Sequence, residues 1–262
     1  MLMEAGVLSA RRLKEIASLK RRKMRTQLGQ TFVEGPRGIE AAVYGGAAVQ
    51  ELLVANSILE SGKYAAEIAE WGLPVFGVPD KQCARISDVA TGQGIVATIQ
   101  ISSVPEERLV KARRLLLLDA VQDPGNVGAL IRSAAWFGVD GVIAGIGSAD
   151  PFSPKVVRAS TGGVWGVQVA ESKDLVESVR RWRERKFACY GADQRGEEIV
   201  RWKPKQPSCL VVGNEGAGIS ADVRSALDML VSVGGSSRPS PVESLNAAVA
   251  GGLIMARWVG AV

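Results

Sequence analysis

The sequence contains no histidine among its 262 residues and only three cysteines. Without histidine, enzymes that use a Ser-His-Asp or Cys-His arrangement are excluded, and a zinc site is not expected. Cys83, Cys189 and Cys209 lack the spacing of a disulfide framework or a metal-binding knuckle, so we interpret them as buried apolar residues. We therefore expect no bound metal.

Long hydrophobic runs are also missing. No apolar stretch approaches the roughly 18 residues that a membrane span requires, and the amino terminus lacks the apolar core of a signal peptide. Hydrophobic residues make up 47% of the chain and aromatic residues 5%, which is ordinary for an α/β protein. We predict a cytoplasmic protein without membrane contact, large enough for one big domain or two small ones.

The formal charge of +5 is distributed unevenly. Residues 1–25 hold only two acidic side chains, Glu4 and Glu15, against eight basic ones, which are Arg11, Arg12, Lys14, Lys20, Arg21, Arg22, Lys23 and Arg25. This density suits contact with nucleic-acid phosphates. A solvated amphipathic helix is the alternative interpretation.

Short apolar runs alternate with helical patterns through the first hundred residues. The pattern predicts strands at 31–35, 51–54, 74–78 and 94–101, with helices over 36–43 and 64–70. A compact α/β domain follows from this alternation. The next ten residues are polar, contain Pro105 and are typical of a linker. We place a first domain at 1–102, the linker at 103–112 and a second domain at 113–262.

The second domain opens with a βαβ pattern. Arg114–Asp119 predicts a strand buried on both faces, Asp123–Gly128 a turn, Ala129–Phe137 a helix, and residues 140–145 a second strand. The pattern therefore predicts a parallel sheet. The turn is not Gly-x-Gly-x-x-Gly, and no acidic residue follows at the spacing of a ribose contact, so dinucleotide binding is disfavoured.

Two turns in the last third of the chain predict a cofactor pocket. Residues 213–218 (GNEGAG) follow the apolar run 209–212 and precede a predicted helix, and residues 242–246 (VESLN) form the second turn. A strand, a glycine-rich turn and a helix bring backbone N–H groups close to a small ligand. Asn214 and Glu215 would place an amide and a carboxylate beside that ligand. A turn without any ligand is the alternative.

Three segments, Asp123–Gly138, Leu210–Ser220 and Glu243–Ala250, resemble the three ordered motifs of the SpoU (TrmH) family of RNA ribose 2′-O-methyltransferases. Lys155–Gly162 is similar to an intermediate segment of the family. Arg22–Arg37, with Thr91–Ala97, resembles the substrate-binding domain of rRNA-directed members. The resemblance implies S-adenosyl-L-methionine as cofactor, RNA as substrate with rRNA favoured over tRNA, and a homodimer. It also implies a deep trefoil knot of the SPOUT type in the parallel-sheet α/β domain, and a smaller α/β domain like ribosomal protein L30e.

The resemblance also implies roles for single residues. Arg132 matches the essential arginine that acts on the 2′-hydroxyl group, although a guanidinium with a pKa above about 12 is a poor base and phosphate anchoring is an equal alternative. Further catalytic positions are Asn126, Glu215, Ser244 and Asn246. Cofactor-binding positions are Gly213, Asn214, Gly216, Val233 and Leu245. RNA-binding positions are Arg21, Arg22, Lys23, Arg25, Arg37 and Arg158.

One segment departs from the pattern of the family. Val231–Val242 lacks the usual Ile-Pro pair and is longer, with many glycine, serine and proline residues. An alternative interpretation is therefore that the protein binds RNA but has lost catalytic activity.

Near the carboxyl terminus, Leu253, Ile254 and Trp258 predict an apolar stripe suited to contact with a second copy across a two-fold axis.

Overall fold

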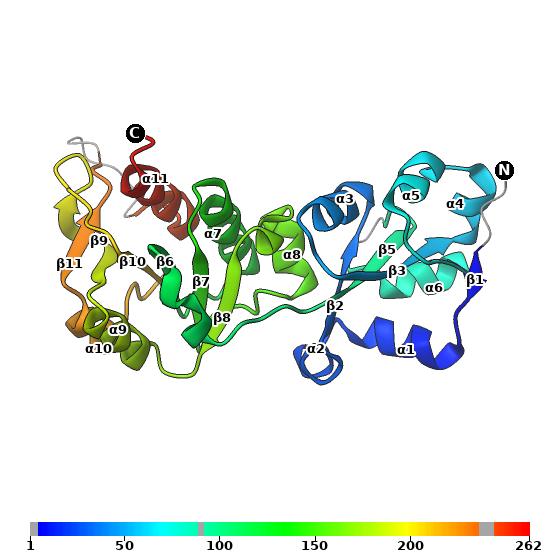
Figure 1. The fold of residues 1–262 in the computed structure, drawn as a ribbon, viewed down its shortest axis with the longest axis horizontal. Coiled ribbons are helices and arrows are strands. Elements are labelled where there is room, and N and C mark those ends of the chain that lie inside the picture. The colour runs from blue at the N-terminus through cyan, green and yellow to red at the C-terminus, as the bar shows by residue number, and fades with distance from the viewer. Residues whose placement is uncertain (1–4, 89–91, 236–243) are drawn as a thin grey trace.

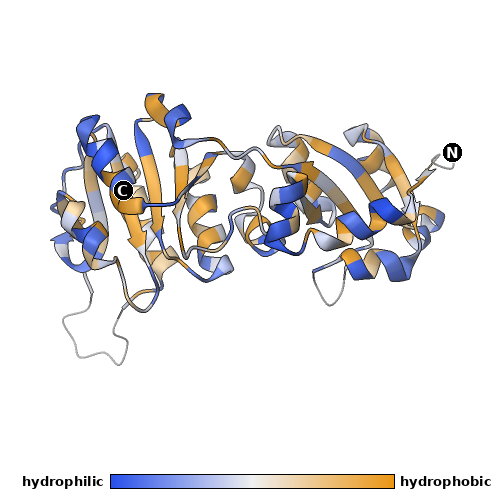
Figure 2. Ribbon diagram, turned by 90° about the horizontal axis from the view of Figure 1, so that it is seen from below, coloured by the Kyte–Doolittle hydropathy of each residue, from blue (hydrophilic) through white to orange (hydrophobic). Residues whose placement is uncertain are grey.

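The computed structural model describes residues 5–88, 92–235 and 244–262. They form two α/β units, each built around its own sheet, which lie end to end in an elongated molecule (Figure 1). In both units the strands are the most hydrophobic segments, and the hydrophilic residues gather on helices and loops (Figure 2). No described helix is both long enough and apolar enough to cross a membrane.

The amino-terminal unit has a five-stranded sheet in the order β1-β4-β3-β5-β2, in which β5 runs antiparallel to both of its neighbours. Its strands are β1 (Gly6–Val7), β2 (Gln30–Glu34), β3 (Val49–Ala55), β4 (Val75–Val78) and β5 (Ile95–Gln100). Its helices are α1 (Ala10–Ser18), α2 (Arg22–Leu28), α3 (Pro36–Tyr44), α4 (Asn56–Ser61), α5 (Ala65–Trp71) and α6 (Asp80–Ile86). The predicted strands β2 to β5 are confirmed, with ends shifted by a residue or two.

The basic amino-terminal run divides into α1 and α2. Ser9 caps α1 by accepting a hydrogen bond from the backbone N–H of Arg12. The apolar side of this segment belongs to the core, because Ile16 and Leu19 are fully buried. Its charged side faces outward, as an amphipathic helix requires.

The carboxyl-terminal unit has a six-stranded, entirely parallel sheet in the order β11-β9-β10-β6-β7-β8. The parallel sheet predicted from the βαβ pattern is confirmed. Its strands are β6 (Arg114–Asp119), β7 (Gly141–Gly145), β8 (Gln168–Ser172), β9 (Ala188–Glu198), β10 (Ser208–Gly213) and β11 (Met229–Ser232). Its helices are α7 (Pro124–Trp136), α8 (Pro154–Ser160), α9 (Leu175–Glu184), α10 (Ala221–Ala226) and α11 (Ala247–Val259), with the 3-10 turns η1 (Glu106–Lys111) and η2 (Gly163–Trp165).

Helices cover both faces of this sheet, as the four buried leucines of β6 predict. Leu116 and Leu118 belong to the same core cluster as the inner sides of α7 and α11. Leu115 and Leu117 belong to the cluster that includes α9 and α10. The three cysteines are also buried, as expected from the sequence.

The predicted linker is an ordered part of the second unit. Its η1 turn buries Leu109, and Ser103 forms an isolated bridge with Val169 of β8. The carboxylate of Glu106 is buried as well and accepts a hydrogen bond from the hydroxyl of Ser178 at 2.7 Å. A single buried leucine among polar residues gives too weak a pattern for the sequence to predict this packing.

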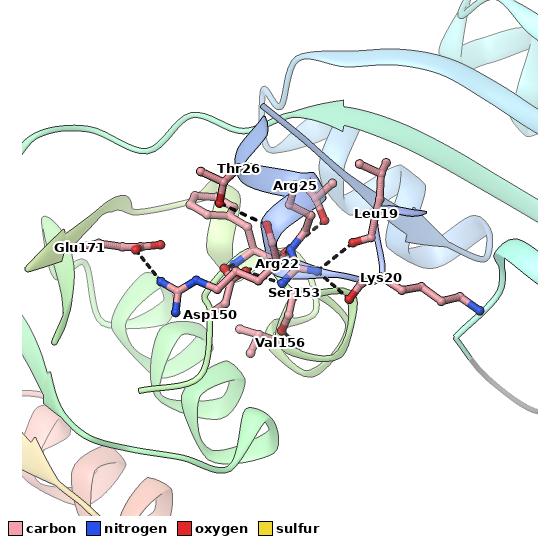
Figure 3. A network of polar contacts seen from close by, with 11 residues as sticks. Leu19, Lys20, Arg22, Arg25, Thr26, Asp150, Ser153, Val156 and Glu171 are labelled. Atoms are coloured by element: carbon pink, nitrogen blue, oxygen red, sulfur yellow. Dashed lines mark hydrogen bonds and ion pairs between the residues drawn. The ribbon is translucent and has the colours of Figure 1, made fainter. Parts of the chain in front are cut away.

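Buried polar contacts join the two units. The guanidinium of Arg25 pairs with Asp150, with 3.0 Å between Nε and Oδ2, and donates to the carbonyl oxygens of Leu19 and Lys20 at 2.7 and 2.9 Å (Figure 3). Thr31 donates its hydroxyl to the carbonyl oxygen of Phe152 across the same junction, at 2.7 Å. Arg25 is only 3% exposed, so the prediction that it binds RNA is wrong.

The carboxyl-terminal helix also differs from expectation. Ile254 and Trp258 are each 1% exposed, and the indole of Trp258 donates to the hydroxyl of Ser208 at 2.8 Å. These two side chains therefore belong to the core of the unit. The exposed apolar side of α11 consists of Val249 and Leu253, at 50% and 43% exposure.

Candidate functional site

The carboxyl ends of β6 and β10 lie side by side in the sheet, with Asp119 opposite Gly213. In parallel α/β sheets, ligands bind at this edge. The turn after β10 and the turn that leads into α7 both begin here. Asp119 also fixes the start of α10, because its carboxylate accepts a hydrogen bond from the backbone N–H of Ser220 at 2.7 Å.

Asn214 organises the turn after β10. Its backbone exchanges hydrogen bonds with Gly218 at 3.0 and 2.9 Å, and its side-chain oxygen accepts from the N–H groups of Gly216 and Ala217, each at 3.0 Å. Its side-chain amide donates to the carbonyl oxygen of Ala120 at 2.9 Å, which ties the turn to the end of β6. The Asn214 side chain thus supports the site through contacts within the chain.

Gly213 is required by this turn itself. A Cβ atom at this position would lie 2.3 Å from the carbonyl carbon of Gly218 and from the backbone nitrogen of Ile219. A Cβ atom does not approach non-bonded heavy atoms so closely in folded proteins, so residue 213 must lack a side chain for the turn to close. Close packing within the turn, and not only the approach of a ligand expected from the sequence, thus requires a glycine at this position.

The space beside Gly216 is open. A Cβ atom there would meet nothing closer than the side-chain oxygen of Asn214 at 3.7 Å. Two apolar side chains predicted to hold the cofactor remain accessible in part, since Leu245 is 48% exposed and Val233 is half-buried. An open backbone turn and partly exposed apolar side chains fit a ligand such as S-adenosyl-L-methionine.

Three predicted catalytic residues from distant parts of the chain form one hydrogen-bonded chain. The side-chain amide of Asn126 donates to Oε1 of Glu215 at 2.9 Å, and the amide of Asn246 donates to Oδ1 of Asn126 at 2.9 Å. Asn246 also caps α11, because its oxygen accepts from the N–H of Ala248 at 2.9 Å. The arrangement connects the turn after β10 to the first turns of α7 and α11.

Glu215 is held as an anion by its donors. Burial acts to raise the pKa of Glu215. Hydrogen bonds from the Asn126 amide and from the backbone N–H groups of Asp123 and Gln122 act in the opposite direction. Their combined effect is larger, so the pKa is lowered. A carboxylate with a lowered pKa is a weak base. Glu215 is therefore suited to orient its neighbours and not to accept a proton.

Arg132 lies apart from this chain of contacts. It follows Asn126 by six residues on α7, which corresponds to about 9 Å along the helix axis and a rotation of about 240°. Its guanidinium donates to the hydroxyl of Thr161 at 3.4 Å, after α8. Gly163 packs against the same point of α7, where an added Cβ atom would lie 2.8 Å from the Cα atom of Arg132.

The remaining predicted residues occupy different environments. Ser244 is exposed and directly precedes the Leu245-Asn246 pair, whereas residues 236–242 of the unusual loop lie outside the described part of the chain. The predicted RNA-binding residues other than Arg25 lie at the surface, and two of them form ion pairs there. Arg22 pairs with Glu171 at 2.7 Å, and Arg158 pairs with Glu34 at 3.1 Å and with Asp88 at 3.8 Å. The other three, Arg21, Lys23 and Arg37, are exposed.

Sequence reasoning missed three residues that build the site. Asp123 caps α7 and accepts from the N–H of Asn126 at 2.9 Å, a role that an aspartate before Pro124 could have indicated. Thr161 and Gly163 hold Arg132 in place. Their role depends on how α8 and η2 pack against α7, so no local signal could have revealed it.

Comparison with known proteins finds relatives over nearly the whole chain. The model of the SpoU rRNA Methylase family matches residues 113–256, and that of the MRM3-like substrate binding domain matches residues 10–97. The chain is 31% identical to 23S rRNA (guanosine(2553)-2′-O)-methyltransferase RlmP of Bacillus subtilis, over 93% of this chain and 94% of that protein. It is also 31% identical to 23S rRNA (uridine(2479)-2′-O)-methyltransferase of Streptomyces viridochromogenes, over 89% and 85% of the two chains.

Solved structures agree with these matches. The SpoU methyltransferase AviRb from Streptomyces viridochromogenes, in complex with the cofactor AdoMet, superposes with a TM-score of 0.82 at 28% identity, over 97% of this chain and 98% of that chain. A putative RNA methyltransferase of the TrmH family from Porphyromonas gingivalis has a TM-score of 0.79 at 32% identity, over 97% and 98% of the two chains. The polar edge formed by β6, β10 and α11 is thus carried on the same fold as these enzymes, and the chain belongs to the SpoU rRNA methylase family.

Proposed function

We propose that this protein transfers a methyl group from S-adenosyl-L-methionine to a ribose 2′-hydroxyl group of ribosomal RNA. The hydrogen-bonded chain of Asn246, Asn126 and Glu215 carries the proposal, because it joins the three family motifs at the carboxyl edge of a parallel sheet. The choice of ribosomal RNA rests on the relatives from Bacillus subtilis and Streptomyces viridochromogenes, which are both named as 23S rRNA 2′-O-methyltransferases. A ribosomal substrate also favours a cytoplasmic location.

The cofactor site is the edge formed by the turn after β10 and the start of α11. The backbone near Gly213, Asn214 and Gly216 would line one side, and the partly exposed Val233 and Leu245 the other. When bound, S-adenosyl-L-methionine supplies an electrophilic methyl group on a sulfonium centre. Asn126, Ser244 and Asn246 are suited to orient the ribose for in-line attack.

Arg132 acts on the ribose by electrostatics. A guanidinium remains protonated at neutral pH, so it is a poor base but a strong donor to an oxygen that becomes negative. Such a donor stabilises the forming alkoxide and thereby lowers the pKa of the 2′-hydroxyl group. The proton released from the 2′-hydroxyl group passes to solvent, and the ionised Glu215 orients its neighbours.

Binding of the RNA is divided between the two units. We assign residues 1–102 to substrate binding, 103–112 to the connection and 113–262 to methyl transfer. The match of residues 10–97 to a substrate binding domain supports this division. The mixed sheet with helices on both sides is compatible with a domain like ribosomal protein L30e. Its exposed cations Arg21, Lys23 and Arg37 are suited to phosphate contact.

The carboxyl-terminal unit is expected to contain the deep trefoil knot of SPOUT methyltransferases. Support comes from the path of the chain, because β11 is an outer strand whereas the following helix, α11, packs against α7 and β10 (Figure 1). Knots are rare, so the family relationship is the main support.

A homodimer is expected from the same helices. Trp136 on α7 is 84% exposed, and Val249 and Leu253 on α11 are 50% and 43% exposed. α7 and α11 pack against each other, so these exposed apolar side chains come from two neighbouring helices. Exposed apolar surfaces of this kind mark interaction sites, and a self-complementary contact across a two-fold axis would cover this one.

The function is tested by methyl transfer to RNA from cells that lack the gene. Purified protein and radiolabelled S-adenosyl-L-methionine are mixed separately with ribosomal and transfer RNA, and the product is mapped by 2′-O-methyl sequencing. We expect labelling of ribosomal RNA at a ribose oxygen. Labelling of transfer RNA alone would overturn the assignment of ribosomal RNA as the substrate. Binding of the cofactor without methyl transfer to either RNA would overturn the enzymatic function.

The role of Arg132 is tested in the same assay. Arg132→Ala should reduce the rate by about 10²–10³-fold, the usual cost of removing one preorganised donor. Arg132→Lys keeps the charge but loses the planar fork of donors. A lysine variant as fast as the wild type would show that a point charge is sufficient at this position.

A further inference from the structure

β2 and α3 of the amino-terminal unit lie next to α8 of the carboxyl-terminal unit (Figure 1). A cavity of about 180 Å³ is lined by residues from both sides of this junction. Both units contribute to its wall. Residues of the amino-terminal unit that line it include Val33, Glu34, Arg37 and Gln93, and those of the carboxyl-terminal unit include Val157, Arg158, Thr161 and Trp165. Its volume is below the roughly 300 Å³ of pockets for drug-sized ligands, so it suits one flat ring system.

The cavity adjoins the catalytic arginine. Thr161 lines the cavity, and its hydroxyl accepts the hydrogen bond from Arg132 at 3.4 Å. The wall is fixed at this point, because Gly163 lies against the backbone of Arg132 and Gly162 against Ala41 of α3. A ligand in the cavity would therefore lie next to the guanidinium of Arg132, at a position set by both units.

The wall combines three kinds of chemistry. It offers the amide of Gln93 and the hydroxyl of Thr161. It also includes the carboxylate of Glu34, which accepts hydrogen bonds from Arg158 at 3.1 Å, from the hydroxyl of Ser87 at 2.5 Å and from the N–H of Asp88 at 3.3 Å. It also offers apolar surface from Val33, Val157 and Trp165. Arg37 is exposed and makes no hydrogen bond or ion pair with any described residue. A site for phosphate alone would need only cations, whereas mixed donors and acceptors beside apolar walls match the edge and faces of a nucleobase.

We propose that this junction cavity binds one unstacked nucleobase of the RNA substrate, beside the ribose on which Arg132 acts, with Arg37 on the adjoining phosphate. The inference rests on the proposed function and specifies how the substrate is chosen. Proteins that read RNA sequence bind unstacked bases, and enzymes that modify nucleotides take them out of the stack. The cavity would thus allow the substrate-binding unit to select the nucleotide presented to the methyltransferase unit.

The direct test is photo-crosslinking with the full-length protein. Ribosomal RNA transcribed with 4-thiouridine, or in a second reaction with 6-thioguanosine, is bound in the presence of S-adenosyl-L-methionine and irradiated. The crosslinked peptides are then identified by mass spectrometry. We expect adducts in residues 33–38 or 157–165. Adducts confined to α1 and α2 in both reactions would overturn the proposal.

Kinetics of three variants provide an independent test. Gln93→Ala and Arg37→Gln each remove one group of the cavity, and Lys81→Gln removes another exposed cation, which lies on α6 and does not line the cavity. The two cavity variants should raise the KM for ribosomal RNA by about tenfold, with kcat and the Kd for S-adenosyl-L-methionine nearly unchanged. Thermal unfolding checks that each variant is folded.

The outcomes separate the two proposals. An active wild type whose two cavity variants behave like Lys81→Gln would overturn the base pocket and leave the methyltransferase function standing. A wild type that methylates no RNA would overturn the function itself. A raised KM in both cavity variants, with the control unchanged, would support the pocket.

Discussion

Asn126 and Asn246 are separated by 120 residues, yet the amide of Asn246 donates to the side-chain oxygen of Asn126 at 2.9 Å. The side-chain amide of Asn126 in turn donates a hydrogen bond to Glu215, also at 2.9 Å. An amide is suited to the middle position because it can donate and accept at the same time. The contact fixes the start of α11 against the start of α7.

Replacing Asn126 with alanine should therefore remove the hydrogen bonds that join Asn246 to Glu215. We expect methyl transfer to fall by about 10²-fold, because Asn246 and Glu215 lose their common partner. The measurement is single-turnover transfer to ribosomal RNA. Gln168→Ala, which removes an exposed amide at the opposite edge of the sheet, is the matched control and should keep the wild-type rate. A wild-type rate in Asn126→Ala would show that these amides do not orient the substrate.

The contribution of Glu215 should depend on pH. Its pKa is lowered in the folded protein, so the stability that the ionised group contributes is present above its unfolded-state pKa and is lost as pH falls through the folded-state value. Denaturant unfolding of the wild type and of Glu215→Gln is compared at about pH 7 and about pH 4. The difference in unfolding free energy should narrow at the lower pH. An equal difference in unfolding free energy at both pH values would contradict a lowered pKa of Glu215 in the folded protein.

Two glycines of one turn should respond differently to valine. Gly213→Val forces a side chain into the backbone of Gly218, so we expect the unfolding free energy to fall by about 1–3 kcal/mol or more. Gly216→Val points into open space and should unfold like the wild type. It should nevertheless weaken binding of S-adenosyl-L-methionine by at least about tenfold in calorimetry. Unchanged binding in Gly216→Val would exclude this space as the cofactor site.

Two neighbouring cations of α2 should also differ. Arg25→Gln leaves the carboxylate of Asp150, which is only 10% exposed, without its ion-pair partner, and we expect a loss of about 3–5 kcal/mol of unfolding free energy. Lys23→Gln should change stability by less than about 0.5 kcal/mol. It should instead lower the salt dependence of RNA binding by about one unit of slope. A deletion of residues 1–25 cannot replace this pair, because it removes the core residues Ile16 and Leu19.

The dimer is tested on the exposed side of α11. Leu253→Glu places a charge in the expected contact and should give a monomer by sedimentation velocity at concentrations where the wild type is dimeric. Val200→Glu introduces the same charge at a residue that is 73% exposed outside α7 and α11, and should remain dimeric. A dimeric Leu253→Glu variant would place the contact elsewhere.

Local patterns in the sequence were sufficient for the fold class. The leucines of Arg114–Asp119 predict a strand covered on both faces, and all four are fully buried. Turn residues after the strands predict the edge where a ligand binds, and that is where Asn126 and Glu215 meet. These features follow from the sequence because hydrophobic periodicity and turn chemistry act over a few residues. The resemblance between motifs then added the expected role of each residue.

Tertiary packing decided which members of a pattern are available for function. Lys23 and Arg25 belong to one basic run, yet only Arg25 is buried. Its guanidinium pairs with Asp150, which lies 125 residues further along the chain. Leu253 and Ile254 are adjacent on α11, and only Ile254 reaches the core. The position of Arg132 likewise depends on a hydroxyl contributed by a different segment. Burial and ion pairing are set by segments that meet only after the chain has folded, so the sequence could indicate the chemistry present but not which side chains face solvent.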